Sequence, residues 1–130
     1  MIGYVTIGHN GIDQSAAFYD AAFAPLGYVQ TFKDPGSGWV GYGPKEKAEG
    51  LPDIMLAKPH DGGTATFGNG SMLAFKAGSR ANVDAFHAAA LDAGGKDEGA
   101  PGVRGSFEPP FYGAYVRDPA GNKLCAYFSG

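Results

Sequence analysis

The only cysteine of this 130-residue chain, Cys125, lies near its end, in the stretch DPAGNKLCAYF. This stretch predicts a tight turn that leads into an apolar strand. A thiol becomes a nucleophile when a nearby cation or base lowers its pKa. Lys123 lies two residues earlier, on the same face of an alternating strand, and could supply that cation. Nucleophilic attack and the lining of a cavity are therefore both open interpretations of Cys125.

A second candidate for chemistry is the stretch APGVRGSFEPPFYG, whose charged side chains are Arg104 and Glu108. Its glycines and prolines predict a loop, and loops often carry function. We expect Arg104 to bind an anionic group while Phe107, Phe111 and Tyr112 cover a flat or apolar ligand. The alternative is that Arg104 and Glu108 are simply solvated.

The histidines are candidates for acid–base chemistry. His9 follows the first predicted strand in a GHNG turn, so it lies either at the rim of a cavity or in an exposed turn. His60 and His87 are expected at the surface. Their spacing does not form a metal-binding triad. A metal-free enzyme would use Glu108, His9, Tyr4 or Cys125 as acid, base or nucleophile.

Composition excludes several classes of protein. Hydrophobic residues make up 44% of the chain and charged residues 18%, with 22 glycines and nine prolines, which is typical of a turn-rich globular protein with many strands. The formal net charge is -3 without a basic cluster, so we expect no nucleic acid partner. The chain lacks a basic, apolar leader and any run of about 18 apolar residues, so we expect a cytoplasmic protein and no membrane contact.

An internal repeat divides the chain in two. FYDAAFAPLG at residues 18–27 matches FHAAALDAGG at residues 86–95, a shift of 68. The same shift aligns YVTI with MLAF, and a shift of 70 aligns DIMLA with KLCAY. The repeat predicts one domain, residues 1–130, built from two modules at about residues 1–60 and 70–130.

Hydrophobic periodicity predicts the order β-α-β-β-β in each module. In the first module we expect strands at 4–7, 28–34, 38–43 and 53–57, and a helix at 15–26 that ends at Gly27. In the second we expect a strand at 71–77, a helix from 79 that closes at Gly94 and Gly95, a mostly irregular stretch with a short strand near Val103, and strands at 111–118 and 122–128. The predicted class is α+β, a curved and mostly antiparallel sheet with outer helices around a concave cavity for a small ligand.

These segments together resemble the vicinal oxygen chelate superfamily, which includes glyoxalase I, bleomycin-resistance proteins and extradiol dioxygenases. The resemblance rests on YVTIGHNGIDQSAAFYDAAFAPLGY, MLAFKAGSRANVDAFHAAALDAGG, GAPGVR and FYGAYVRDPAGNKLCAYF, in the order of the family. It implies paired βαβββ modules, a homodimer and, in the enzymes of the family, one divalent metal in the concave face. Members with a similar loop tend to have His where Glu108 stands.

Family enzymes take their metal ligands, typically His or Glu, from the first and last strands of each module. The resemblance assigns these positions to Tyr4, Met55, Met72 and Cys125, and the repeat pairs Tyr4 with Met72 and Met55 with Cys125. The two thioethers are poor ligands for Zn, Ni, Fe or Mn, the phenol has a high pKa, and the usual His and Glu donors are missing, so we expect no metal and no other cofactor. A soft Cu(I) site formed by the three sulfur atoms is an alternative.

Three functions remain open. The first is a metal-free binding protein of bleomycin-resistance type, in which Trp39, the residues at the four ligand positions and the Arg104 loop bind a small aromatic or anionic molecule. The second is the metal-free enzyme described above. The third is a metal-dependent lyase, similar to lactoylglutathione lyase, or a dioxygenase with displaced Zn, Ni, Fe or Mn ligands. The fold alone does not decide between them.

Overall fold

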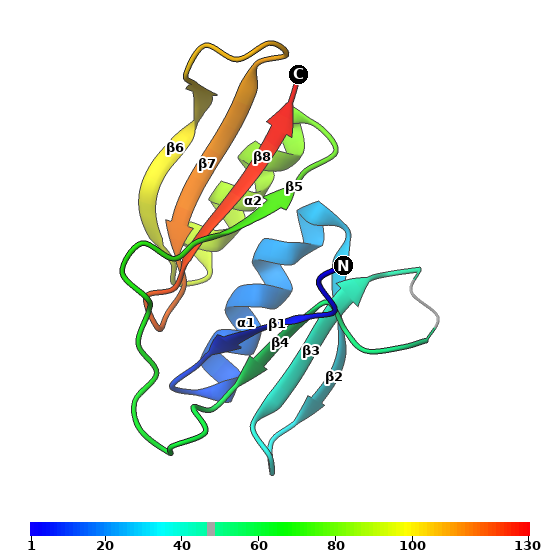
Figure 1. The fold of residues 1–130 in the computed structure, drawn as a ribbon, viewed down its shortest axis with the longest axis vertical. Helices are drawn as coiled ribbons and strands as arrows, with labels where there is room; N and C mark the ends of the chain where they lie inside the picture. The colour runs from blue at the N-terminus through cyan, green and yellow to red at the C-terminus, as the bar shows by residue number, and fades with distance from the viewer. Residues whose placement is uncertain (47–48) are drawn as a thin grey trace.

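The computed structural model describes residues 1–46 and 49–130, and the order β-α-β-β-β occurs twice (Figure 1). The first module contains β1 (Val5–Gly8), α1 (Ile12–Phe23), a short 3₁₀ turn η1 (Ala24–Leu26), β2 (Tyr28–Asp34), β3 (Trp39–Pro44) and β4 (Ile54–Ala57). The second contains β5 (Leu73–Lys76), α2 (Arg80–Asp92), β6 (Lys96–Arg104), β7 (Phe111–Arg117) and β8 (Lys123–Ser129). The predicted order is confirmed. Residues 47–48, in the predicted connection between the third and fourth strands, lie outside the described residues.

Each module forms a four-stranded mixed sheet, and the two sheets share one topology. Their strand orders are β1-β4-β3-β2 and β5-β8-β7-β6. The first and last strands of each module pair in parallel, and the remaining pairs are antiparallel. Parallel neighbours need a long crossover, which the helix and the two intervening strands provide. The predicted mostly antiparallel pairing is therefore confirmed, with one parallel pair in each sheet.

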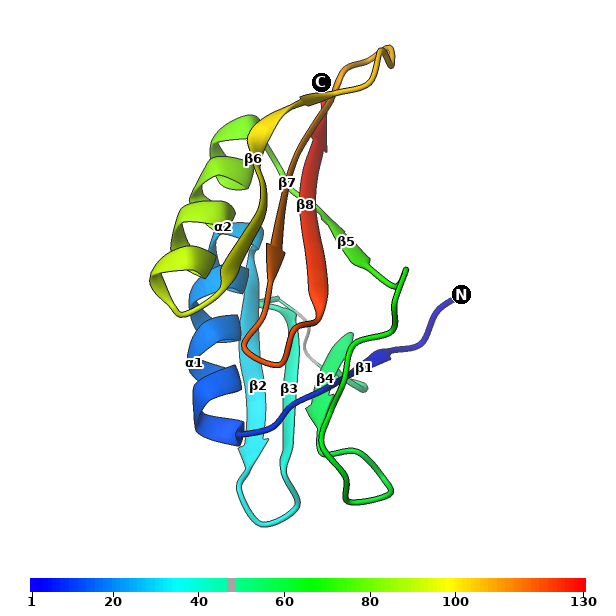
Figure 2. The same cartoon turned by 90° about the vertical axis from the view of Figure 1, so that its left-hand side faces the viewer.

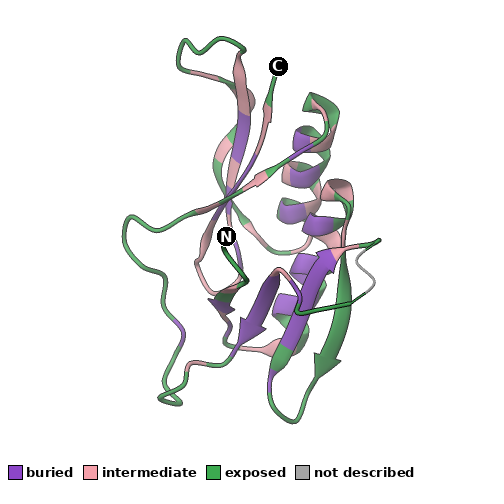
Figure 3. Ribbon diagram, turned by 45° about the vertical axis from the view of Figure 1, so that its right-hand side comes forward, coloured by how far each residue is buried: buried purple, intermediate pink, exposed green. Residues whose placement is uncertain are grey.

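Both helices lie on the same side of the two sheets (Figure 2). The main hydrophobic core lies between helices and sheets and draws on both modules. Figure 3 shows buried residues on both helices and on strands of both sheets. Among the fully buried side chains of this core are Phe18 and Phe23 of α1 and Phe86 of α2. Burial of each such ring contributes about 1.5–3 kcal/mol. Neither helix among the described residues has the length and apolar character needed to cross a membrane.

The α-helix ends at Phe23, and the 3₁₀ turn η1 carries the helical segment to the predicted end at Gly27, which adopts a left-handed conformation with φ 79° and whose N–H donates to the carbonyl of Ala24. The prediction for β6 was wrong in extent. Residues 96–104 form a nine-residue strand rather than a mostly irregular stretch. The strand lies at the edge of its sheet, and register shifts between Asp97 and Gly102 accommodate its glycines and its proline.

A buried carboxylate joins α1 of the first module to the β7–β8 turn of the second. The hydroxyl of Tyr19 donates to Oδ2 of Asp118 at 2.6 Å, although the two residues are 99 positions apart. The other oxygen, Oδ1, accepts the backbone N–H groups of Ala120 and Asn122, each at 2.9 Å. Burial and the neighbouring carboxylate raise the pKa of Tyr19 well above its usual range, so its hydroxyl stays a donor.

Asn122 extends this contact to the end of β1. Its side-chain amide donates to Oδ2 of Asp118 at 2.8 Å and to the carbonyl of Gly8 at 3.0 Å. Gly8 is the last residue of β1, and Lys123 is the first of β8. The start of β8 is therefore fixed against both α1 and β1.

We expect Tyr19→Phe to lower the free energy of unfolding by about 1.5–3 kcal/mol, because it removes a buried hydrogen bond to a charged group. Urea unfolding followed by circular dichroism measures the change. Tyr112→Phe is the matched control, because the Tyr112 hydroxyl also donates to a carboxylate at 2.6 Å, that of Asp84, but in an exposed position. The control should leave unfolding nearly unchanged. Equal effects of the two substitutions would contradict the role given to Asp118.

Candidate functional site

The sheet face turned away from α1 and α2, which we call the open face, carries alternate side chains of each strand. On β8, Leu124 and Ala126 belong to the core, so Lys123, Cys125 and Tyr127 lie on the open face. The same alternation places open-face residues of β7 on either side of Val116, which is also in the core. The second sheet thus presents several functional groups from adjacent strands on one surface.

Tyr115 of β7 lies between two cations on the open face. The guanidinium carbon of Arg104 lies 5.6 Å from the centre of its ring, and Nζ of Lys123 lies 5.6 Å from the same centre. Both distances are within the range of a cation–π interaction. Arg104 also donates to the carbonyl of Ala100 at 2.6 Å, which holds the guanidinium along the sheet.

Three glycines of β6 and β7 leave room for the open-face side chains. A Cβ at Gly99 would stand 2.9 Å from the ring of Tyr115, and one at Gly102 would stand 2.9 Å from Nη1 of Arg104. A Cβ at Gly113 would stand 2.6 Å from the ring of Phe111. The glycines of this strand pair therefore serve the open face as well as the backbone.

Aromatic rings continue the surface toward the β6–β7 loop. The rings of Phe111 and Tyr127 are stacked, with centroids 5.2 Å apart and planes within 9°. Phe107, on the loop, follows at 6.4 Å from Phe111 and is 66% exposed. Figure 2 shows this loop bending away from the helices. We call Arg104, Phe111, Tyr115, Lys123 and Tyr127 the aromatic–cationic cluster.

Cys125 lies within the cluster and is fully buried. Burial raises the pKa of the thiol, and the hydrogen bond with Tyr115 and the charges of Arg104 and Lys123 offset only part of that effect. The pKa of Tyr115 is also raised, chiefly by burial. A nucleophilic cysteine needs the opposite shift and an exposed sulfur. This geometry argues against the nucleophile interpretation of Cys125, and Cys125 is not among the lining residues of the cavity described below.

A cavity of about 470 Å³ adjoins the cluster at Lys123 and lies where the two modules meet. Both modules contribute to its wall, the first with Thr6 of β1 and the second with Lys123 of β8. Phe67 and Met72, in the connection between β4 and β5, also line it. Of the four ligand positions, Met72 lines this cavity, whereas Tyr4, Met55 and Cys125 are not among its lining residues.

Comparison with known proteins defines the family. A glyoxalase/bleomycin resistance protein from Albidiferax ferrireducens T118 is 37% identical over 97% of both chains, with a TM-score of 0.83. This chain belongs to the glyoxalase/bleomycin resistance protein family. The resemblance to the vicinal oxygen chelate superfamily is thereby confirmed.

More distant structures share the fold. A glyoxalase/bleomycin resistance protein/dioxygenase family enzyme from Burkholderia phytofirmans PsJN is 20% identical over 99% of this chain and 98% of its own, with a TM-score of 0.70. A lactoylglutathione lyase from Agrobacterium tumefaciens is 20% identical over 98% and 92%, with a TM-score of 0.64. No protein-family model and no curated protein matches the chain.

The four ligand positions of the family do not fit a divalent metal in this member. Strand pairing places Thr6 beside Met55 and Ala74 beside Cys125. Tyr4 lies two residues before Thr6, and Met72 lies two residues before Ala74. Tyr4 and Met72 are 47% and 44% exposed, whereas Met55 and Cys125 are buried. Among residues 1–46 and 49–130, no group of three His, Cys, Asp or Glu side chains could hold a metal ion. The donors at these positions are a phenol, two thioethers and one thiol; the thioethers suit Zn, Ni, Fe and Mn poorly, and the single thiol stands without the His and carboxylate donors that these ions take.

Of the two positions that the sequence left open for His9, a cavity rim and an exposed turn, the exposed turn is wrong. His9 is only 2% exposed, and its Nε2 lies 2.7 Å from the carbonyl of Gly38 in the β2–β3 turn. Its backbone N–H donates to the carbonyl of Ala57, which continues the β1–β4 ladder and draws the side chain inward. The glycine-rich GHNG pattern predicts a turn but does not show what packs over it.

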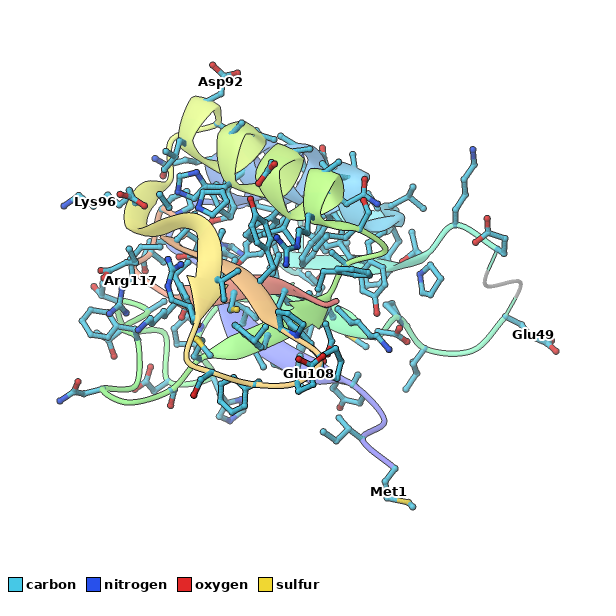
Figure 4. The ribbon with its side chains drawn as sticks, turned by 90° about the horizontal axis from the view of Figure 1, so that it is seen from above. Met1, Glu49, Asp92, Lys96, Glu108 and Arg117 are labelled. Atoms are coloured by element: carbon cyan, nitrogen blue, oxygen red, sulfur yellow. The ribbon has the colours of Figure 1, made fainter. Side chains whose placement is uncertain are left out.

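The candidate acid–base groups are dispersed. Glu108 is exposed on the β6–β7 loop, on the side away from the helices (Figure 4). His9 is held at the end of β1 by its contact with Gly38, and Cys125 is buried in β8. The described residues therefore provide no assembled acid–base pair from this set. His60 is exposed as expected, whereas His87 is half-buried and contacts Asp97 at 2.9 Å.

Two predicted ligand-binding residues lie away from the cluster. Tyr112 is on the helix side of β7, where its hydroxyl donates to Asp84 of α2 and Arg80 covers its ring at 4.8 Å. Trp39 starts β3 in the other module and is 39% exposed, while Tyr42 of the same strand is fully buried. The two residues lie an odd number of positions apart in the strand, so alternation turns them to opposite faces.

Sequence reasoning missed Tyr115 and Tyr127. Strand alternation from Cys125 would have found Tyr127, and alternation from Phe111 would have found Tyr115. The position of Arg104 could not be found this way, because the register shifts in β6 break the alternation.

We expect Cys125 to react with Ellman's reagent at least about a hundredfold more slowly in the native protein than in urea, because reaction requires opening of the fold. Stopped-flow absorbance measures both rates. In the native protein the reaction should become half-maximal only above pH 9.0, the ordinary pKa of the thiol. A native rate that approaches the unfolded rate near neutral pH would restore the nucleophile interpretation.

Proposed function

We propose that the protein is a metal-independent binding protein that holds a small aromatic anion at the aromatic–cationic cluster. The supporting observation is the arrangement of Arg104 and Lys123 on either side of Tyr115, next to the stacked rings of Phe111 and Tyr127. Within the described residues neither cation forms an ion pair. Their charge is therefore available to a ligand.

The chemistry of the cluster favours a ligand that is both flat and negatively charged. A carboxylate accepts charge-assisted hydrogen bonds from a guanidinium or an ammonium group, and these are stronger than neutral ones. An aromatic ring of the ligand gains from offset or edge contacts with Phe111 and Tyr127. The exposed Phe107 can cover the ring from the loop side. The adjoining cavity of about 470 Å³ has the size of a small-molecule site.

The proposal needs no metal, which agrees with the donors at the four family ligand positions. A lyase or a dioxygenase with displaced ligands would need another set of His or carboxylate side chains. A metal-free enzyme would need an assembled acid–base pair, and Glu108, His9 and Cys125 do not supply one. Binding without turnover is therefore the function that these residues support best.

We expect benzoate and naphthoate to bind in isothermal titration calorimetry, and the neutral amides of the same rings to bind at least about tenfold more weakly. Arg104→Gln should weaken binding of the carboxylates about tenfold to a hundredfold, because it removes one charge-assisted contact. It should leave binding of the neutral amides nearly unchanged.

Arg80→Gln is the matched control, since Arg80 also lies over a tyrosine ring, that of Tyr112, but on the helix side. It should leave all affinities unchanged. Carboxylates that bind no better than amides, or equal losses in the two variants, would contradict the proposal.

Elemental mass spectrometry of untagged protein, purified without chelator, tests the metal-dependent alternative. We expect Zn, Ni, Fe, Mn and Cu well below one equivalent. A stoichiometric Zn, Ni, Fe or Mn would contradict metal-independent binding and favour displaced ligands. Stoichiometric Cu would favour the sulfur site of Met55, Met72 and Cys125.

A further inference from the structure

Asparagine is followed by glycine twice in this chain, at Asn10–Gly11 and at Asn69–Gly70. In this dipeptide the backbone nitrogen of the glycine can attack the preceding side-chain amide, because glycine has no Cβ to shield that nitrogen. The attack is the first step of spontaneous deamidation. The two pairs share the same covalent chemistry, so a difference in their reactivity must come from the fold.

The fold holds the side chain of Asn10 at both ends. Its Nδ2 donates to the carbonyl of Ala65 at 3.1 Å, and its Oδ1 accepts the N–H of Ala65 at 2.7 Å. Ala65 is only 6% exposed and packs against Gly8, where an added Cβ would stand 3.0 Å from the Cβ of Ala65. The amide of Asn10 must leave both hydrogen bonds before the nitrogen of Gly11 can reach its Cγ. The contact with Ala65 therefore protects Asn10.

Asn69 lies in an exposed turn of the connection between β4 and β5. The N–H of Ser71 donates to the carbonyl of Gly68 at 2.9 Å and closes this turn, and Asn69 and Gly70 are both exposed. Within residues 1–46 and 49–130, neither the side-chain amide of Asn69 nor the N–H of Gly70 has a hydrogen-bond partner. An added Cβ at Gly70 would meet nothing within 4 Å, so the nitrogen is uncrowded. The second pair therefore lacks the protection of the first.

The backbone of the turn explains why glycine follows Asn69. Gly70 has a φ of 95°, in the region that side chains with a Cβ rarely adopt. The turn thus needs the residue type that leaves its own nitrogen open to attack.

We propose that Asn69 is a site of spontaneous deamidation, which adds a negative charge at the rim of the cavity between the two modules. The backbone nitrogen of Gly70 attacks Cγ of Asn69 and gives up its proton to solvent. The new N–Cγ bond closes a five-membered succinimide ring, while the Cγ–Nδ2 bond breaks and Nδ2 takes up a proton and leaves as ammonia. Water then opens the ring at either carbonyl and produces aspartate or isoaspartate. The reaction consumes one water and needs no oxidant or reductant.

The new charge lies beside the cavity of about 470 Å³, because Gly68 and Ser71, which flank the pair, both line it. Lys123 is the one charged side chain among the described residues of that lining. A carboxylate at position 69 opposes the attraction of Lys123 for an anion. This effect on binding rests on the proposed function, whereas the modification itself does not.

Peptide mapping by mass spectrometry, after incubation in mildly alkaline buffer, tests the modification. In the native protein we expect Asn69 to lose its amide at least about tenfold faster than Asn10, because reaction at Asn10 requires two hydrogen bonds to open. In urea the two pairs should react at similar rates. Ion-exchange chromatography of the native protein should resolve an acidic form that Asn69→Gln lacks, because glutamine would have to form a less favourable six-membered ring.

Equal rates at Asn69 and Asn10 in the native protein would overturn the proposal. Retention of the Asn69 amide in the native protein, under conditions where the unfolded chain loses it, would also overturn it. Isomerisation at Asp61–Gly62 leaves the charge unchanged, so ion exchange distinguishes it from deamidation.

Asn69→Asp provides the charged product in homogeneous form and tests the effect on the cavity. It should weaken binding of benzoate about twofold to fivefold at low ionic strength and leave binding of neutral benzamide unchanged. Asn82→Asp is the matched control, because it makes the same change in the first turn of α2, on the other side of the sheet. It should leave both affinities unchanged.

Equal effects of these two substitutions on benzoate would overturn the effect on the cavity. Absence of benzoate binding to the unmodified protein would instead contradict the proposed function. Peptide mapping and ion exchange would still decide the modification of Asn69, so the two proposals can fail separately.

Discussion

The buried carboxylate of Asp118 fixes the geometry on which the rest of the molecule depends. It accepts the hydroxyl of Tyr19, two backbone N–H groups of its own turn and the amide of Asn122, which also reaches the carbonyl of Gly8. These contacts join α1, β1 and the start of β8 across the two modules. Since a buried charge is costly unless fully hydrogen-bonded, the arrangement tolerates little displacement. Lys123 and Cys125 lie just after Asn122 in the chain, so these contacts position them.

The two modules share a topology, but their open faces differ in chemistry. In the first module a Cβ at Gly41 would meet Phe32 and Pro52, and one at Gly8 would meet Ala65 of the connection, so protein atoms cover part of that face, although Thr6 still lines the cavity between the modules. In the second module the corresponding face carries the aromatic–cationic cluster. Backbone pairing preserves the repeat, while the side chains on the face away from the helices are free to diverge.

The residues at the four family ligand positions suit an apolar environment rather than a metal site. Where the family places His or Glu, Met55 and Cys125 are buried and Tyr4 and Met72 are half-exposed. Carboxylate or imidazole groups would make an apolar surface costly unless a metal or a hydrogen bond satisfied them. Thioethers and a protonated thiol carry no such cost. The same change removes metal donors and places a buried thiol, Cys125, near Arg104 and Lys123.

The sequence by itself determined the two modules and their element order, because these depend on local periodicity, and its motifs carried the resemblance that implied the family and the four ligand positions. It also located Arg104, Phe111 and Cys125 as site candidates. Only the tertiary structure decided that Tyr112 faces α2, that His9 is buried against Gly38, and that residues 96–104 form a bulged strand. These features depend on register and on contacts between residues distant in the chain, which local patterns do not encode.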